Sequence, residues 1–161
     1  MAEENGHESK VRDLRSLGQR LIGGWTTEAT HPYLPGTVIL GSSEIEWLEG
    51  ERFLIYRSSY DYPDIPDAIA IIGDTDGLHM HYFDTRGVHR IYDVEVTDEG
   101  WDISMDRDAP VSSFASPDDR FSQRMRFTFA DDERSIEGRG KLSHDNVTWE
   151  DDLQITYRRT V

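Results

Sequence analysis

Two arginines lie on strand faces that are otherwise apolar. Arg57 shares its parity with Phe53 and Ile55, and Arg90 shares its parity with Tyr92. A guanidinium buried inside a protein must be paired, because burying the charge alone costs several kcal/mol. One or both arginines are therefore predicted to bind a ligand carboxylate in a bidentate fork. The alternatives are an exposed arginine or an internal ion pair, for which the candidate acids are Glu44, Glu46 and Asp93.

Three histidines form the only other group of side chains that could converge. His79 and His81 are two residues apart, alongside Phe83, and His89 begins the next hairpin arm. Cross-strand side chains lie about 5 Å apart, so the imidazoles could meet, as in a minimal metal site. Spacing fixes no third or fourth firm ligand, so we predict partly exposed histidines on a polar face and no bound metal. Acid–base catalysis by a barrel histidine is the alternative.

The remaining motifs favour turns. The Asp84–Gly87 segment suits a hairpin, with Arg86 at its tip as a possible gate. The acidic runs at 131–133 and 151–152 are interpreted as solvated turns, because calcium-loop spacing is absent. The chain has no cysteine, and it shows no nucleophile elbow, phosphate loop or dinucleotide fingerprint. No catalytic residues are therefore predicted, and an enzyme is considered less probable than a binding protein.

Composition limits the partners. The net charge is −15, from 32 acidic and 17 basic residues, which repels nucleic acid and anionic membranes. The first ten residues are polar and contain no apolar signal segment. No apolar run approaches the roughly 18 residues of a membrane helix. A soluble, cytoplasmic protein is expected.

The elements that must position these residues are mostly strands. Residues 1–9 are expected to be a disordered leader, and residues 10–22 an amphipathic helix with apolar residues at helical spacing. A first strand is expected near Trp25. Period-two alternation between turn signals then predicts strands at 36–48, 52–60, 68–72, 78–83, 88–96, 101–105, 120–129, 135–142 and 147–158.

A meander of this length must hide its edges, and closure into a barrel does so. One helix cannot cover so large an open sheet. We therefore predict an all-β fold: a closed antiparallel meander barrel of about eight to ten strands with one short N-terminal helix, forming a single domain over residues 10–161. Trp25 is expected to plug the closed end beside the helix, and Trp47 to line the cavity.

Several segments together resemble a family of small bacterial lipocalin-like (calycin) barrel proteins, which is known for its barrel and has no established reaction. The resemblance covers residues 17–158, and its most specific part is Tyr82-Phe83-Asp84-Thr85-Arg86-Gly87-Val88. The other segments are 21–25, 30–32, 35–37, 46–50, 121–124 and 149–158.

The Gly-x-Trp segment at 23–25 and the Tyr157-Arg158-Arg159 ending are more distantly similar to nitrobindins, which are ten-stranded barrels of fatty-acid-binding shape that hold haem. That likeness would imply a haem cofactor. Nitrobindins, however, place the iron-binding histidine on a late strand, and residues 147–158 contain none.

A barrel of this size has room for one small ligand. The predicted function is non-catalytic binding of a small hydrophobic molecule, with or without an acid group, as a carrier or sensor. The alternatives are a barrel enzyme (isomerase, cyclase or hydrolase) resting on His79, His81, Tyr92 and Arg90, and a haem protein. No cofactor is predicted, and a monomer or homodimer is expected. Strand parity predicts that the ligand-binding, lumen-facing residues are Trp47, Arg57, Arg90, Tyr92, Phe121, Gln123 and Tyr157.

Overall fold

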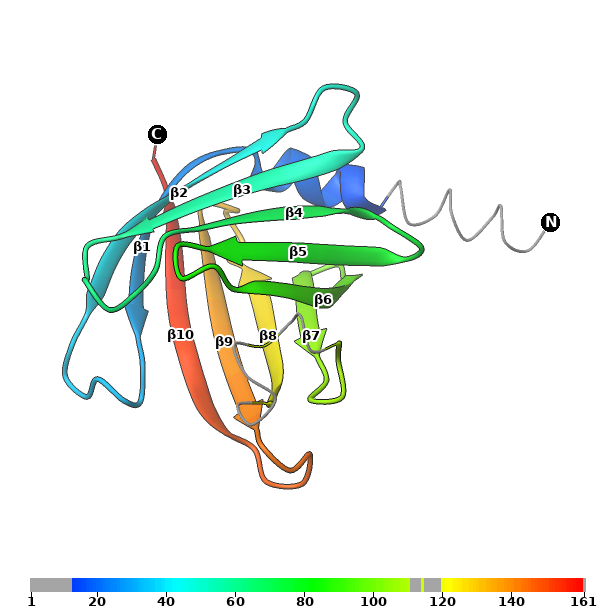
Figure 1. Ribbon diagram of the computed structural model, residues 1–161. Helices are drawn as coiled ribbons and strands as arrows, with labels where there is room; N and C mark the ends of the chain where they lie inside the picture. The colour runs from blue at the N-terminus through cyan, green and yellow to red at the C-terminus, as the bar shows by residue number, and fades with distance from the viewer. Residues whose placement is uncertain (1–12, 111–113, 115–119, 161) are drawn as a thin grey trace.

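Ten antiparallel strands close into a barrel (Figure 1). The computed structural model describes residues 13–110, 114 and 120–160, so the predicted leader at 1–9 lies outside the described residues. Each strand pairs with the next along the chain, and β1 also pairs with β10. The predicted all-β meander barrel is confirmed. Its strands are β1 (Gly23–Thr30), β2 (Ile39–Trp47), β3 (Phe53–Tyr60), β4 (Ala68–Asp74), β5 (Leu78–Asp84), β6 (His89–Val96), β7 (Gly100–Met105), β8 (Ser122–Phe129), β9 (Ser135–Ser143) and β10 (Glu150–Arg159).

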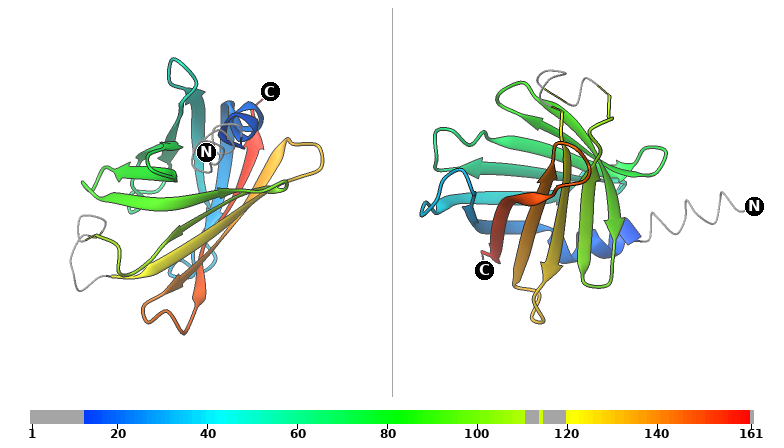
Figure 2. Two further views of the ribbon diagram at one scale, coloured as in Figure 1. Left: turned by 90° about the vertical axis from the view of Figure 1, so that its right-hand side faces the viewer. Right: turned by 90° about the horizontal axis from the view of Figure 1, so that it is seen from below.

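The barrel has two different ends. Strands β3–β6 run steeply across strands β7–β10, so the wall bends around the lumen (Figure 1). The helix lies at one end, beside the turn between β8 and β9, in both views of Figure 2. Because the chain is a meander, the loops at 31–38, 61–67, 85–88 and 144–149 all lie at the opposite end, which we call the mouth.

The N-terminal helix covers residues 13–21 within the described part of the chain. Leu14, Leu17 and Leu21 are buried, as their helical spacing predicts. Arg20 fixes the helix end, donating from Nε to Glu133 Oε1 at 2.8 Å. Ile22, the last residue of the predicted helix, lies beyond the helix and is exposed. No helix among the described residues is long and apolar enough to cross a membrane.

The two tryptophans at the closed end differ in role from each other. Trp25 is buried beneath the helix and donates from Nε1 to the Leu21 carbonyl at 2.9 Å, as expected for a plug. Trp47 also faces inward, but its ring packs so closely on Gly18 that a Cβ there would lie 2.1 Å from it. The helix occupies the space above this end of β2. The expectation that Trp47 lines the cavity is therefore wrong.

Side chains alternate between the inner and outer wall, and β8 follows the predicted parity. Met125 and Phe127 are buried, while Arg124 and Arg126 are exposed. On β3 the parity differs from the prediction. Leu54 faces inward with no exposed surface, so Arg57 lies on the outer wall, where it pairs with Glu46. Both faces of β3 carry apolar residues, and alternation alone could not assign its inner face.

The histidines of the β5–β6 hairpin lie on the outer wall, opposite in parity to Arg90 and Tyr92. His79 pairs with Asp93 at 3.1 Å, and the rings of His81 and His89 stack with centroids 5.7 Å apart. Burial, followed by the charges of His89 and His79, lowers the pKa of His81. These histidines therefore do not converge with Arg90 and Tyr92, and the enzyme hypothesis loses the arrangement on which it rested.

Replacing Trp25 by alanine should destabilise the barrel by about 3–5 kcal/mol, because the change empties a fully buried site and removes the Leu21 hydrogen bond. The measurement is the free energy of unfolding in urea. Trp149→Ala is the matched control. Trp149 is partly exposed, and its ring centroid lies 4.2 Å from Arg124 Cζ. Removing this side chain should therefore lower the free energy of unfolding by less than about 1 kcal/mol. Equal losses for the two variants would show that Trp25 does not anchor the helix.

Candidate functional site

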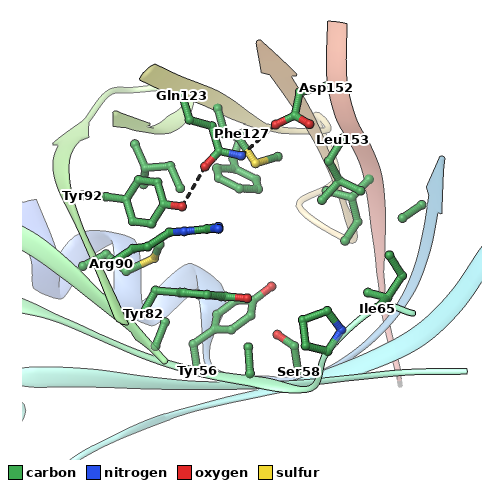
Figure 3. A pocket seen from close by; sticks show the side chains of 18 of the residues that line it. Tyr56, Ser58, Ile65, Tyr82, Arg90, Tyr92, Gln123, Phe127, Asp152 and Leu153 are labelled. Carbon is green, nitrogen blue, oxygen red and sulfur yellow. Dashed lines mark hydrogen bonds between the residues drawn. The ribbon is translucent and has the colours of Figure 1, made fainter. Parts of the chain in front are cut away.

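The barrel encloses a cavity of about 370 Å³ that opens toward the mouth. Its wall is formed by inward-facing side chains from most of the strands, and Figure 3 shows them surrounding an empty centre. Small side chains account for part of the space, because Ala29, Ala68 and Ala70 face inward where longer residues would fill the lumen. The volume lies at the lower end of the range of small-molecule sites.

Five of the seven side chains predicted to face the lumen line this cavity: Arg90, Tyr92, Phe121, Gln123 and Tyr157. Trp47 and Arg57 do not, for the reasons given above. The five come from β6, the approach to β8, β8 itself and β10, so closure of the barrel brings together residues far apart in sequence. Their role in binding a ligand stays a prediction.

Of the two arginines that line the cavity, Arg86 makes an ion pair and Arg90 makes none within the described part of the chain. Its Nε is buried and makes no hydrogen bond. The guanidinium lies near two aromatic rings, 5.1 Å from the centroid of Phe121 and 5.8 Å from that of Tyr82. Figure 3 shows it projecting from the β6 wall into the centre of the cavity. These cation–π contacts offset only part of the hydration that the guanidinium loses on burial. Without a carboxylate partner, the rest of that cost is not compensated.

Arg86, at the tip of the β5–β6 turn, shows the opposite situation. Its guanidinium donates to Asp84 Oδ2 at 2.6 Å, and the Tyr82 hydroxyl donates to the same oxygen at 3.0 Å. Burial alone would raise the pKa of Asp84, but the hydrogen bonds from Arg86 and Tyr82 lower it overall. Asp84 therefore neutralises Arg86 at the mouth, and the pair leaves Arg90 without a share in this carboxylate.

A chain of hydrogen bonds crosses the wall opposite Tyr82. The Tyr92 hydroxyl donates to Gln123 Oε1 at 2.7 Å, and Gln123 Nε2 donates to Asp152 Oδ2 at 2.7 Å. The other Asp152 oxygen lies 3.0 Å from His31 Nε2. The Tyr33 backbone N–H donates to His31 Nδ1, so the ring proton must be on Nε2, directed at Asp152. Neutral donors thus hold the Asp152 carboxylate in one orientation (Figure 3).

Asp152 reaches the lumen because β10 is irregular. The pairing of β10 with β9 shifts register between Asp151 and Gln154, which turns Asp152 inward next to Leu153. The residue is buried, so its interpretation as part of a solvated turn is wrong. Bulges commonly redirect a side chain beside a functional site. Strict alternation could not reveal this one, and His31 was missed because it belongs to a loop.

A second polar group lies on the β3 side of the cavity, where hydroxyls gather. Tyr56, Ser58, Tyr60 and Tyr157 line it, and buried Ser43 donates to Ser58 Oγ at 3.5 Å. The Tyr56 hydroxyl is buried and has no hydrogen bond of good geometry, although the hydroxyls of Ser43, Ser58 and Tyr157 are close enough to affect its ionisation. Burial raises the pKa values of Tyr56 and Tyr157, so both stay protonated phenols at neutral pH.

Five tyrosines that line the cavity should ionise at a higher pH in the folded barrel than in the unfolded chain. Burial is the largest cause of the raised pKa values of Tyr56, Tyr60, Tyr82, Tyr92 and Tyr157. Unfolded tyrosine ionises near pH 10, so above that pH the folded state retains more protons and stability falls as pH rises. Tyrosinate absorbance of these five should increase together with the loss of tertiary circular dichroism. Protein unfolded in urea, titrating near pH 10, is the control. Ionisation of all five before unfolding would contradict this.

Comparison with known proteins shows the fold alone. The barrel is similar to the crystal structure of Rv2717c from M. tuberculosis, with a TM-score of 0.62 and 14% identity over 92% of this chain and 98% of that one. Two redesigned β-barrels are less similar. One, b11L5F_LGL, has a TM-score of 0.47, with 11% identity over 90% of this chain and 96% of its own.

The other, mFAP1 bound to DFHBI, has a TM-score of 0.44, with 12% identity over 89% of this chain and 98% of its own. No protein-family model and no curated protein matches the sequence. At these identities the likeness shows a closed antiparallel β-barrel fold alone, and the site must be interpreted from this chain's own residues.

Proposed function

We propose that the barrel binds a small, largely apolar organic acid in its cavity, without chemical change, and that Arg90 holds the acid group. The observation that carries this proposal is the guanidinium of Arg90, which faces the cavity with a buried Nε that has no partner. A carboxylate in the cavity would supply the missing counter-charge and can accept from the guanidinium in a bidentate contact. Tyr92, next to Arg90 on the inner face of β6, already donates its hydroxyl proton to Gln123 Oε1, so the acid group is left to Arg90.

The rest of the cavity suits the apolar part of such a molecule. Trp101 and Phe127 stack with centroids 4.4 Å apart, and Leu153 and Ile155 continue this wall. Each Å² of apolar ligand surface that these side chains remove from water contributes about 25 cal/mol to the free energy of binding. The cation gives orientation, while the aliphatic and aromatic wall gives most of the area that a ligand can bury.

Haem fits these residues poorly. His31 is the only histidine that lines the described cavity, and both of its ring nitrogens are engaged, one by Asp152 and the other by the Tyr33 N–H. Tyr56 offers an oxygen, but burial raises its pKa and disfavours the phenolate that would bind iron. The lining therefore provides no free axial ligand of these kinds, which supports the organic-acid proposal over the nitrobindin-like alternative.

Acid–base catalysis on the bound molecule is the second candidate, and the oriented Asp152 carboxylate favours it. General bases are built in this way, with a carboxylate fixed beside the substrate. The two candidates differ in what happens to the ligand. Incubation of octanoate and unsaturated analogues with the protein, followed by NMR, should return them unchanged if the barrel is a carrier. A shifted double bond that depends on Asp152 would instead establish an isomerase.

Replacing Arg90 by methionine should weaken octanoate binding by about ten- to a hundredfold, because one charge-assisted contact contributes about 1.5–3 kcal/mol. Arg57→Met is the matched control, since Arg57 makes an exposed ion pair with Glu46 on the outer wall. That variant should bind octanoate as the wild type does. The measurement is isothermal titration calorimetry on all three proteins. Equal affinities would refute the proposed role of Arg90.

The ligand-free Arg90→Met protein should be at least as stable as the wild type. Methionine fills much of the same volume and removes a cation that has no counter-charge. Thermal unfolding without ligand measures this, and Arg57→Met should change the stability by less than about 1 kcal/mol because exposed pairs contribute little. A large loss of stability in Arg90→Met would mean that the cation has a structural partner.

A further inference from the structure

We propose that the outer wall of β3–β6 binds a second copy of this chain, with the strands of the two copies crossing at about a right angle. This inference concerns the outside of the barrel, so it does not depend on a ligand in the cavity. The outward side chains of these four strands form one continuous surface, which we call the apolar face. Its large apolar residues are Phe53, Ile55, Ile69, Ile71, Phe83 and Ile91.

Strand register places these residues side by side on the outside of the barrel. Ile55, Ile71, His81 and Ile91 are successive cross-strand partners on β3, β4, β5 and β6. A chain neighbour of each lines the cavity, so these four side chains face away from the lumen. The described elements leave the apolar face uncovered in Figure 1, where β3–β6 form one sheet. A contiguous apolar patch that faces solvent marks an interaction site.

The outer wall of the remaining strands differs from the apolar face, because ion pairs cover it. Charged side chains of this kind keep a barrel wall hydrated and disfavour association. Neighbouring strands there are joined by the pairs Arg126–Asp102, Lys141–Asp151 and Arg158–Glu28. The apolar residues are therefore not spread around the barrel but gathered on one side of it.

The side chains of the apolar face are already packed against one another. The Phe53 ring lies over Gly73, where a Cβ would be 2.2 Å from it. The rings of Phe83 and His89 stack with centroids 4.7 Å apart. Side chains that are held in this way lose little further freedom when a partner covers them, which favours binding.

Unlike charges stand at opposite corners of the apolar face. Arg57 aligns with Ile69 at the mouth end of β3, and Asp93 aligns with His79 at the other end of β6. The Asp93 side chain is 79% exposed. Each charge has a local contact, with Glu46 or His79, but a guanidinium and a carboxylate can each make several hydrogen bonds. Both corners can therefore take a partner of opposite charge.

These corners are self-complementary under a two-fold axis, and this favours a second copy over an unrelated partner. Three strand spacings and four residues separate Arg57 from Asp93, so the line between them runs at about 45° to the strands. A two-fold axis between the sheets, perpendicular to this line, places Arg57 of each copy over Asp93 of the other. The strands then cross at about 90°, which is one of the two common arrangements of packed sheets.

The size of the apolar face predicts a weak dimer. Four strands with three outward residues each make a surface of about 20 Å on a side. Two such surfaces bury on the order of 800–1,000 Å², which is the size of a transient interface. We expect a dissociation constant in the micromolar range, with the rim charges fixing the orientation and contributing little to the affinity.

Ile71→Glu should leave the protein monomeric at concentrations where the wild type is a dimer, because it brings two carboxylates together at the centre of the interface. Leu40→Glu is the matched control, since Leu40 is an exposed outward residue on β2, outside the apolar face. Sedimentation velocity over a dilution series measures the association, and circular dichroism checks that each variant folds. A wild type that stays monomeric at millimolar concentration, or equal association of the two variants, would overturn the proposal.

Charge reversal tests the orientation without changing the apolar residues. Arg57→Glu or Asp93→Arg alone should raise the dissociation constant about tenfold, because like charges then meet at both corners. The double variant should return to within about threefold of the wild type, since the opposite charges are restored in exchanged positions. If the double variant associates no better than the single ones, the two copies do not pack in this way and the proposal is refuted.

Discussion

The pairing of β1 with β10 is the constraint on which the rest of the molecule depends. Trp25 to Thr30 align with Gln154 to Arg159, and this contact converts a long meander into a closed wall. Without it, β1 and β10 would expose free edges, and the apolar inner faces would have to be buried elsewhere. Closure also explains the position of the helix. Arg159, at the end of β10, donates to the Ile22 carbonyl, so the strand that closes the barrel also holds the chain leaving the helix.

Closure creates an interior in which polar groups must be satisfied from within the wall. Most of them are. Asp84 neutralises Arg86, and neutral donors hold Asp152. Arg90 is the exception, because the fold satisfies two buried carboxylates and leaves this nearby guanidinium without an ionic partner. Proteins commonly retain such unfavourable groups at functional sites and compensate for them elsewhere.

The fold followed from the sequence because alternation and turn chemistry agree along most of the chain. On β8 and the residue before it, five inward residues alternate with arginines and small polar residues, and this pattern placed Phe121 and Gln123 correctly along the cavity. On β3 that information is absent, since Phe53 and Ile55 oppose Leu54 and Tyr56 in the same strand. Asp152 depends on a bulge, and Trp47 on where the helix packs. These are tertiary effects that no local pattern encodes.

In the proposed function, Arg90 is a cation without an ionic partner that becomes paired when an organic acid enters the barrel. The most direct measurement is the NMR signal of the Arg90 Nε–H group, assigned by its disappearance in Arg90→Met. Titration with octanoate should shift this signal strongly, while octanol, which lacks the charge, should leave it nearly unchanged. An Arg90 signal that stays fixed at saturating octanoate, while signals of other cavity residues move, would contradict the account.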